Sequence, residues 1–429
     1  MRSVLVLALM LVLLGGRWAG ADYVTLDEGD RFGGSRWGVL PYVFSTESLE
    51  TGGGLAVLGA GFLRPELGFA ATAFYTGNDS WLLGGFVRNL RLGEQGRLFL
   101  DGAAQGSHFT QQRFYEGVDP ETGVRFGSND SGKDQFVSGP TDDLYLRLAL
   151  RYVLPLGAGR EAPLTLFRTR RGMRVSEPRG GYVWNPLSSG RTLAGMRLFY
   201  RNRDLQKRDG GKAPAARTNG VELWLDYDNT DFLPNPSFGS RQKLVFVADP
   251  GWLDSSNSWT NLALEVSKYL GLGRTRWFRQ RVLTLGFWTS YTPTWRVDPS
   301  TGEVAHRPPP GFGSTLGGYD RLRAYPSSRF MDKAAVYYAA ELRLTPQVNG
   351  LETLPLIKQF EIDWWQVAAF VEAGRVGPDY DGALFLDDLK WDVGLGVRLM
   401  AFRQPVRLDW AYSDEGHAIW AMIGQPFSR

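Results

Sequence analysis

Strict alternation of apolar and polar side chains is the feature that most limits what this chain can fold into. It is clearest from Leu144 to Leu154, where every second residue is Leu or Tyr and the opposite face carries Arg147 and Arg151. A second run, Val221 to Asp228, again gathers its charges on one face. Because successive side chains of a β-strand point to opposite faces, the pattern predicts strands with one apolar side.

Alternation of this kind fits a soluble β-sandwich as well as a transmembrane barrel. Four further features favour the barrel: runs of about ten residues, glycine on the charged face, 13% aromatic residues and a secretory N-terminus. In a barrel the apolar face meets lipid, where a charge costs about 2–4 kcal/mol at the midplane. The predicted fold class is therefore all-β, an antiparallel transmembrane barrel.

The barrel is predicted to occupy residues 51–429 and to have about sixteen strands. The candidate strands begin near residues 52, 66, 81, 97, 141, 163, 192, 219, 240, 257, 279, 334, 364, 390, 404 and 416. Three longer polar stretches, Thr110 to Pro140, Leu205 to Asn219 and Pro293 to Lys333, are predicted to be loops on one side of the membrane. No linker indicates a second domain.

The N-terminus has the pattern of a cleaved secretory signal over residues 1–21. Arg2 precedes the apolar run Val4 to Leu14, and Ala19-Gly20-Ala21 provides small residues at the expected cleavage point. The run is too short to cross the membrane as a helix, although an uncleaved anchor is the alternative. Residues 22–50 are then predicted to form a short periplasmic segment before the barrel.

Composition excludes several classes of function. The formal net charge is only +3, from 48 Lys and Arg against 45 Asp and Glu, which does not favour a nucleic-acid partner. The chain has no cysteine and only three scattered histidines, so we expect no metal and no cofactor. Because no nucleophile elbow, phosphate loop or zinc motif occurs, we expect no enzymatic activity, and a hydrolase built on barrel strands is the weakest alternative.

One segment of the third polar stretch carries more specific information. Within Gly317-Gly318-Tyr319-Asp320-Arg321-Leu322-Arg323-Ala324-Tyr325-Pro326, the tetrapeptide Leu322 to Tyr325 resembles the lumen-loop motif of the outer-membrane insertase superfamily. This superfamily comprises the BamA/TamA-type or bacterial surface antigen barrels and the two-partner secretion transporters, whose motif is an apolar residue, Arg, Gly and an aromatic. Ala324 stands where the family has Gly. Unlike glycine, alanine adopts a positive φ only at an energetic cost.

The resemblance continues through most of residues 221 to 427. The matching segments, in chain order, are Asp226 to Asn229 with Asn235-Pro236 and Gly239, Glu341 to Arg343, Phe370 to Arg375, Gly394 to Arg398 and Val406 to Ala411. It implies that the loop folds back into the barrel lumen. A guanidinium in a lumen needs planar acceptors, and by alternation Glu341 and Glu372 face the lumen. Arg323 is therefore predicted to contact one of these carboxylates, unless all three are ordinary solvated lumen charges.

The seam between the first and last strands is predicted to be the weakest part of the barrel. Gly52, Gly53 and Gly54 begin the first predicted strand, and Gly424 and Pro426 lie in the last, where glycine packs little and proline donates no ladder hydrogen bond. Phe427 resembles the closing aromatic residue of the family. The resemblance implies a seam that opens for client strands. An equally good explanation of these glycines is that they let the barrel wall curve.

The sequence places only about thirty residues between Ala21 and the first predicted strand, so POTRA modules, the periplasmic domains of the family, are expected to be missing. The resemblance implies a protein of the bacterial outer membrane with a role in membrane biogenesis as an insertase, or in transport of protein or lipid. Expected partners are outer-membrane lipid and either unfolded outer-membrane proteins or a separate periplasmic protein. A passive, porin-like solute channel is the alternative.

Overall fold

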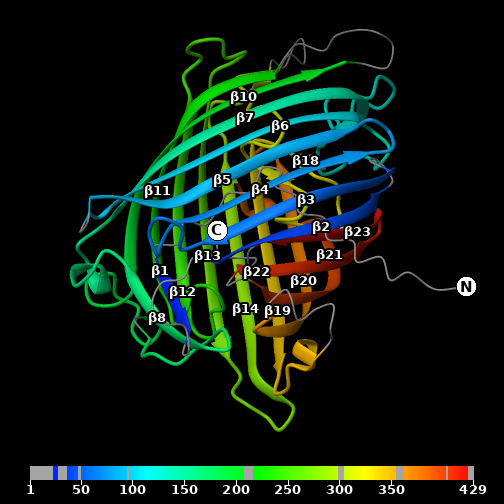
Figure 1. Ribbon diagram of the computed structural model, residues 1–429. Coiled ribbons are helices and arrows are strands. Elements are labelled where there is room, and N and C mark those ends of the chain that lie inside the picture. Colours follow the sequence, from blue (N-terminus) through cyan, green and yellow to red (C-terminus); the bar gives the residue numbers. More distant parts are fainter. Residues whose placement is uncertain are drawn as a thin grey trace, which may run out of the picture.

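The computed structural model describes residues 23–27, 36–46, 50–93, 96–178, 180–206, 216–297, 304–353, 362–401 and 404–423. Its main element is one antiparallel sheet of sixteen strands, curled into a barrel (Figure 1). In spatial order the strands are β2 (Arg36–Thr46), β3 (Glu50–Ala60), β4 (Gly68–Thr76), β5 (Trp81–Leu92), β6 (Leu98–Phe114), β7 (Val137–Val153), β10 (Arg191–Leu205), β11 (Ala216–Thr230), β12 (Gly239–Asp249), β13 (Trp259–Gly271), β14 (Phe278–Tyr291), β19 (Ala334–Pro346), β20 (Trp364–Gly377), β21 (Lys390–Ala401), β22 (Gln404–Ser413) and β23 (Gly416–Ile423).

The remaining elements lie in the connections. A three-stranded sheet contains β1 (Tyr23–Asp27), β8 (Thr165–Arg170) and β9 (Met173–Arg174). Two short hairpins pair β15 (Arg296–Val297) with β16 (Val304–Ala305) and β17 (Thr315–Leu316) with β18 (Phe330–Met331). The helical pieces are η1 (Gly157–Arg160), η2 (Gly350–Thr353) and α1 (Gly382–Leu386). In the described part of the chain, no helix is long and apolar enough to span a membrane.

The predicted all-β fold and the number of barrel strands are confirmed, but one strand was assigned wrongly. The run near residue 163 forms β8, which pairs in parallel with β1 outside the barrel sheet. The barrel strand missing from the prediction is β2, so the sheet begins at Arg36, inside the segment predicted to be periplasmic. Pro41 obscured β2 in the sequence; proline is tolerated there because β2 is an edge strand.

The predicted faces are also confirmed. On β7, Leu144, Leu146 and Leu148 point outward and are 42–50% exposed, whereas Tyr145, Ala149 and Arg151 point inward and are buried. The three predicted loops connect β6 to β7, β10 to β11 and β14 to β19, and in an antiparallel sheet of this order all three lie at one end. We call this end the loop end and the opposite end the turn end.

The largest buried cluster fills the inside of the barrel between the wall and the β14–β19 loop. Aromatic side chains from the wall meet apolar side chains from the loop, among them Tyr145, Phe199, Trp224, Trp259, Trp288, Leu316, Leu322, Tyr325, Phe330, Tyr337 and Phe370. The inside of this part of the barrel is therefore a packed core, with the loop as one of its layers.

Candidate functional site

The tip of the β14–β19 loop is a compact turn held by its own backbone. The Gly318 amide donates to the carbonyl of Tyr325 at 2.9 Å, and the Tyr325 amide donates to the carbonyl of Leu322 at 3.0 Å. Gly317 and Gly318 have φ values of 103° and 97°, which only glycine adopts without strain. These bonds present Arg323 at the end of the turn.

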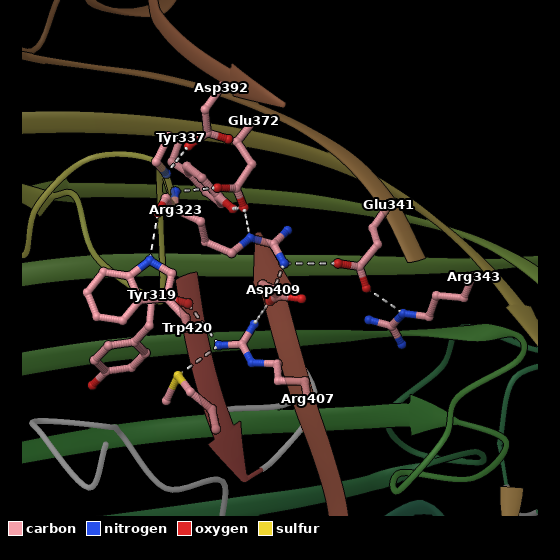
Figure 2. Close-up of polar contacts among 12 residues, drawn as sticks. Tyr319, Arg323, Tyr337, Glu341, Arg343, Glu372, Asp392, Arg407, Asp409 and Trp420 are labelled. Atoms are coloured by element: carbon pink, nitrogen blue, oxygen red, sulfur yellow. Dashed lines mark hydrogen bonds and ion pairs between the residues drawn. The ribbon is translucent and has the colours of Figure 1, made fainter. Parts of the chain in front are cut away.

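Arg323 is the central contact of the loop with the barrel wall (Figure 2). Its Nε donates to Glu372 Oε1 at 2.9 Å, and its backbone amide donates to the other oxygen of the same carboxylate at 2.8 Å. Its Nη1 reaches Glu341 Oε2 at 3.2 Å and Asp409 Oδ2 at 2.8 Å. The predicted pairing is thus present with both carboxylates. The sequence prediction missed the third acceptor, Asp409.

Two aromatic residues complete the surroundings of Arg323. Its guanidinium carbon lies 3.3 Å from the centre of the Phe370 ring, so the cation stacks on the aromatic face. The Tyr337 hydroxyl donates to Glu372 Oε1 at 2.5 Å. Arg323 and its three carboxylates are all at most 1% exposed, which makes removal of any partner costly.

The carboxylates that hold Arg323 are shared with three more arginines of the wall, of which Figure 2 shows Arg343 and Arg407. Arg343 donates to Glu341 at 2.7 Å, Arg398 bonds both Glu341 and Asp409, and Arg407 donates to Asp409 at 3.2 Å. Arg407 also donates to the carbonyl of Tyr319, a second contact with the loop. The result is one buried network joining the loop to β19, β20, β21 and β22.

The residues beside Arg323 in the motif are anchored separately. The Ala324 amide donates to Asp392 Oδ2 at 2.8 Å, and Trp420 Nε1 donates to the Arg323 carbonyl at 2.7 Å. The Tyr325 hydroxyl donates to Asp414 at 2.8 Å; burial and this hydrogen bond raise the pKa of Tyr325, so the hydroxyl stays a donor. The motif therefore also contacts β21 and β23.

The loop tip does not require a positive φ at Ala324. Positive φ falls two residues earlier, at Leu322, whose φ is 55°, and Ala324 is not among the described residues with positive φ. Leu322 is fully buried in the aromatic cluster, which over-determines its unusual backbone. Alanine therefore fits where the resembled family has glycine.

A second set of contacts ties the loop to its neighbours at the loop end. Arg329 pairs with Glu415 at 2.7 Å and donates to the carbonyl of Ser131 at 2.6 Å. Asp332 pairs with Arg125 at 2.7 Å; burial raises the pKa of Asp332, and Arg125 opposes the shift. The β6–β7, β14–β19 and β22–β23 connections are thus cross-linked above the lumen.

Three of the predicted seam residues, Gly52, Gly53 and Gly54, are not in an edge strand. They lie in β3, which is paired on both sides, by β2 and by β4. Gly54 has a packing role: a Cβ there would come within 2.5 Å of the Tyr42 ring. Gly424, Pro426 and Phe427 lie outside the described residues. The edge strands are β2 and β23, and no backbone pairing joins them in the described part of the chain.

The described acidic and histidine side chains do not gather into a metal site. In the ranges that the structure describes, no group of three or more His, Asp and Glu side chains could hold a metal ion. His108 of β6 contacts Asp142 of β7, whereas His306 of the β14–β19 loop contacts Ser258 beside β13. The buried network is instead suited to holding a loop in one position.

Comparison of the sequence with known proteins finds no match, whereas comparison of the structure does. No family model matches the sequence, and no curated protein matches it. Among solved structures, the chain is similar to CdiB from Escherichia coli with a TM-score of 0.54 and 10% identity, covering 90% of this chain and 62% of that one. Further matches are CdiB from Acinetobacter baumannii (TM-score 0.49, 11% identity, 90% and 58% covered) and BamA from Haemophilus ducreyi lacking POTRA domains 1–3 (0.48, 10%, 91% and 68%).

The similarity to CdiB from Escherichia coli shows that the chain has the fold of that barrel. The barrel fold implied by the sequence motif is thereby confirmed. The chain spans 58–68% of the lengths of these three structures.

Proposed function

We propose that this chain is an outer-membrane barrel that inserts, assembles or transports other molecules of the membrane, namely proteins or lipids. The observation that carries the proposal is the loop tip held in the lumen by Arg323 and three carboxylates, within a barrel that has the fold of CdiB. Through this network the loop is bonded to five strands of the wall, β19 to β23.

The position of the loop network supports this reading. Its partners all lie on β19 to β23, the last five strands of the sheet, and β23 is an edge strand. The first half of the wall is joined to this network through the cluster and the loop-end contacts. The network therefore stiffens the side of the barrel that ends in an edge.

The edge itself supports a role with clients that form strands. β2 and β23 present unpaired backbone groups where the described sheet ends, and such groups are templates for an added strand. Pro41 in β2 removes one backbone donor, which weakens pairing along this edge. Lateral entry of client strands between β2 and β23 is thus part of the proposal, and a separate periplasmic protein is a candidate for delivering them.

The experiment that tests the function is depletion of the protein, followed by an inventory of outer-membrane proteins and lipids. We expect loss of other barrels or of a lipid class before growth stops. Re-expression of the wild type should restore the inventory, and the Arg323→Ala variant should not. An unchanged inventory, with a steady ion-selective conductance in planar bilayers, would replace the proposal with the solute channel.

The seam has its own test. A disulfide introduced between β2 and β23 should abolish restoration of the inventory, and reduction of the disulfide should recover it. The matched control is a disulfide between β2 and β3, which are already paired along their whole length. Equal restoration by the two oxidised variants would rule out opening at this seam. We propose no enzymatic activity for the chain.

A further inference from the structure

Three segments converge at the turn end of the barrel and enclose a small pocket. They are the β11–β12 turn, the β13–β14 turn and β9, which belongs to the β7–β10 connection. The pocket has a volume of about 220 Å³. This is below the range of roughly 300–1,000 Å³ that is usual for drug-sized ligands, so the space suits one compact group.

The lining of this pocket is strongly basic. Among the described residues, four arginines line it, Arg174 from β9 and Arg274, Arg279 and Arg281 from the β13–β14 turn and β14. One carboxylate, that of Asp231, lines it as well. Counting these side chains alone, the formal charge is 4 − 1 = +3. Like charges this close repel one another unless an anion lies between them.

Asp231 does not neutralise all the arginines, because its carboxylate is hydrogen-bonded within the β11–β12 turn. It accepts hydrogen bonds from the Ser237 amide at 2.7 Å, the Ser237 hydroxyl at 2.5 Å and the Phe238 amide at 3.2 Å. The nearest Arg174 nitrogen is farther away, at 3.4 Å. The carboxylate thus closes the β11–β12 turn, and neither Arg274 nor Arg281 forms an ion pair within the described part of the chain.

Donor groups also remain available in the pocket. Arg174 Nε is buried and has no hydrogen-bond acceptor in the described part of the chain. Within the described residues, Arg281 donates to two uncharged backbone carbonyls, those of Leu272 and Gly273, and to no carboxylate. Planar guanidinium groups that surround a small space match the oxygens of a phosphate group, to which arginine can bind with two parallel hydrogen bonds.

We propose that this arginine pocket is a binding site for a phosphate group. Two sources share this chemistry, a phospholipid headgroup and a free phosphate ester. The level of the pocket favours the headgroup: Trp277 in the same turn is 65% exposed and Leu272 is 43% exposed, as expected of side chains at the border of a bilayer. Arg174 belongs to the connection that carries β8 and β9, so a bound phosphate would also fix this connection to the barrel.

The test uses the full chain, purified in detergent and titrated with inorganic phosphate by calorimetry. The Arg174→Gln/Arg274→Gln double variant removes two of the four charges and should bind phosphate at least about tenfold more weakly. The matched control is Arg276→Gln: it lies in the same turn, its guanidinium stacks on Trp277 at 4.7 Å, and it does not line the pocket. Its affinity should stay within about twofold of the wild type.

Native mass spectrometry of the protein with anionic phospholipid separates the two sources. Retention of lipid by the wild type and by Arg276→Gln, but not by the double variant, identifies a headgroup site; phosphate binding without retained lipid identifies a site for a free phosphate ester. The proposal is overturned if the wild type binds phosphate no better than the double variant, or if Arg276→Gln loses as much affinity. Should the double variant not fold by circular dichroism, the single change at the exposed Arg274 should still weaken binding about threefold.

Discussion

Buried arginine–carboxylate pairs occur in two regions of this barrel, within the wall and between the wall and the β14–β19 loop, and they stabilise different contacts. On the wall, Arg197 pairs with Glu222 at 2.8 Å and Arg241 pairs with Asp226, each across neighbouring strands that the backbone ladder already joins. Arg323 comes from a loop and reaches carboxylates on β19, β20 and β22. The wall pairs reinforce a contact made by the ladder, whereas Arg323 creates a contact that the ladder does not make.

This difference predicts which part of the molecule each set of arginines stabilises. Strands β10 to β12 keep their register through backbone hydrogen bonds whatever their side chains do. The loop between Tyr291 and Ala334 is held in the lumen by side-chain contacts and by its cluster. Changes at Arg323 should therefore move the loop, and changes at Arg241 should only weaken the wall.

The largest effect is expected from Arg323→Ala. Removal of the guanidinium leaves Glu341, Glu372 and Asp409 with less compensation in a buried site, which costs about 3–5 kcal/mol of unfolding free energy. Limited proteolysis should cut the β14–β19 loop in the folded variant but not in the wild type. Arg241→Ala is the control: it should lower the unfolding free energy without exposing the loop, and equal cleavage would break the comparison.

A smaller effect is expected from Arg323→Lys. Lysine keeps the charge but cannot serve Glu372, Glu341 and Asp409 at the same time with its single ammonium group. The loss of charge-assisted hydrogen bonds should lower the unfolding free energy by about 1.5–3 kcal/mol in urea titrations. A stability equal to that of the wild type would show that charge alone, and not the fork of the guanidinium, holds the loop.

Tyr325→Phe should have a modest effect. It removes the hydroxyl that donates to Asp414 at 2.8 Å, but Asp414 is exposed and water can replace the donor. The expected loss is about 0.5–1.5 kcal/mol, with the loop still protected from protease. Loop cleavage comparable to that of Arg323→Ala would mean that the tyrosine, rather than the arginine, fixes the tip.

The smallest effect is expected from Ala324→Gly, which restores the residue of the resembled family. Because positive φ falls at Leu322 and not at Ala324, glycine relieves no strain and only adds freedom to the unfolded chain. The unfolding free energy should fall by about 0.4–1 kcal/mol. A gain in stability would show that the tip is strained at residue 324 after all.

The sequence was most informative where a side chain repeats with the strand period. Alternation placed Leu144 outside and Arg151 inside, and it put Glu341 and Glu372 on the lumen face. The same rule places Asp409 beside Arg407 on one face of β22, and it could have found the third acceptor. It failed at β2, whose Pro41 interrupts the pattern, and at β8, which alternates equally well outside the barrel.

By itself, the sequence determined the fold class and the facing of the wall residues, because both follow from local periodicity, and a local motif singled out Arg323. The predicted total of sixteen strands also agrees, although a missed strand, β2, and a wrongly assigned run, β8, offset each other in it. Only the tertiary structure decided which runs join the barrel, that Arg323 has three acceptors, that Leu322 takes the positive φ and that four arginines meet at the turn end. These features depend on residues far apart in the chain, and their proximity is set by strand pairing and loop packing, which no local pattern specifies.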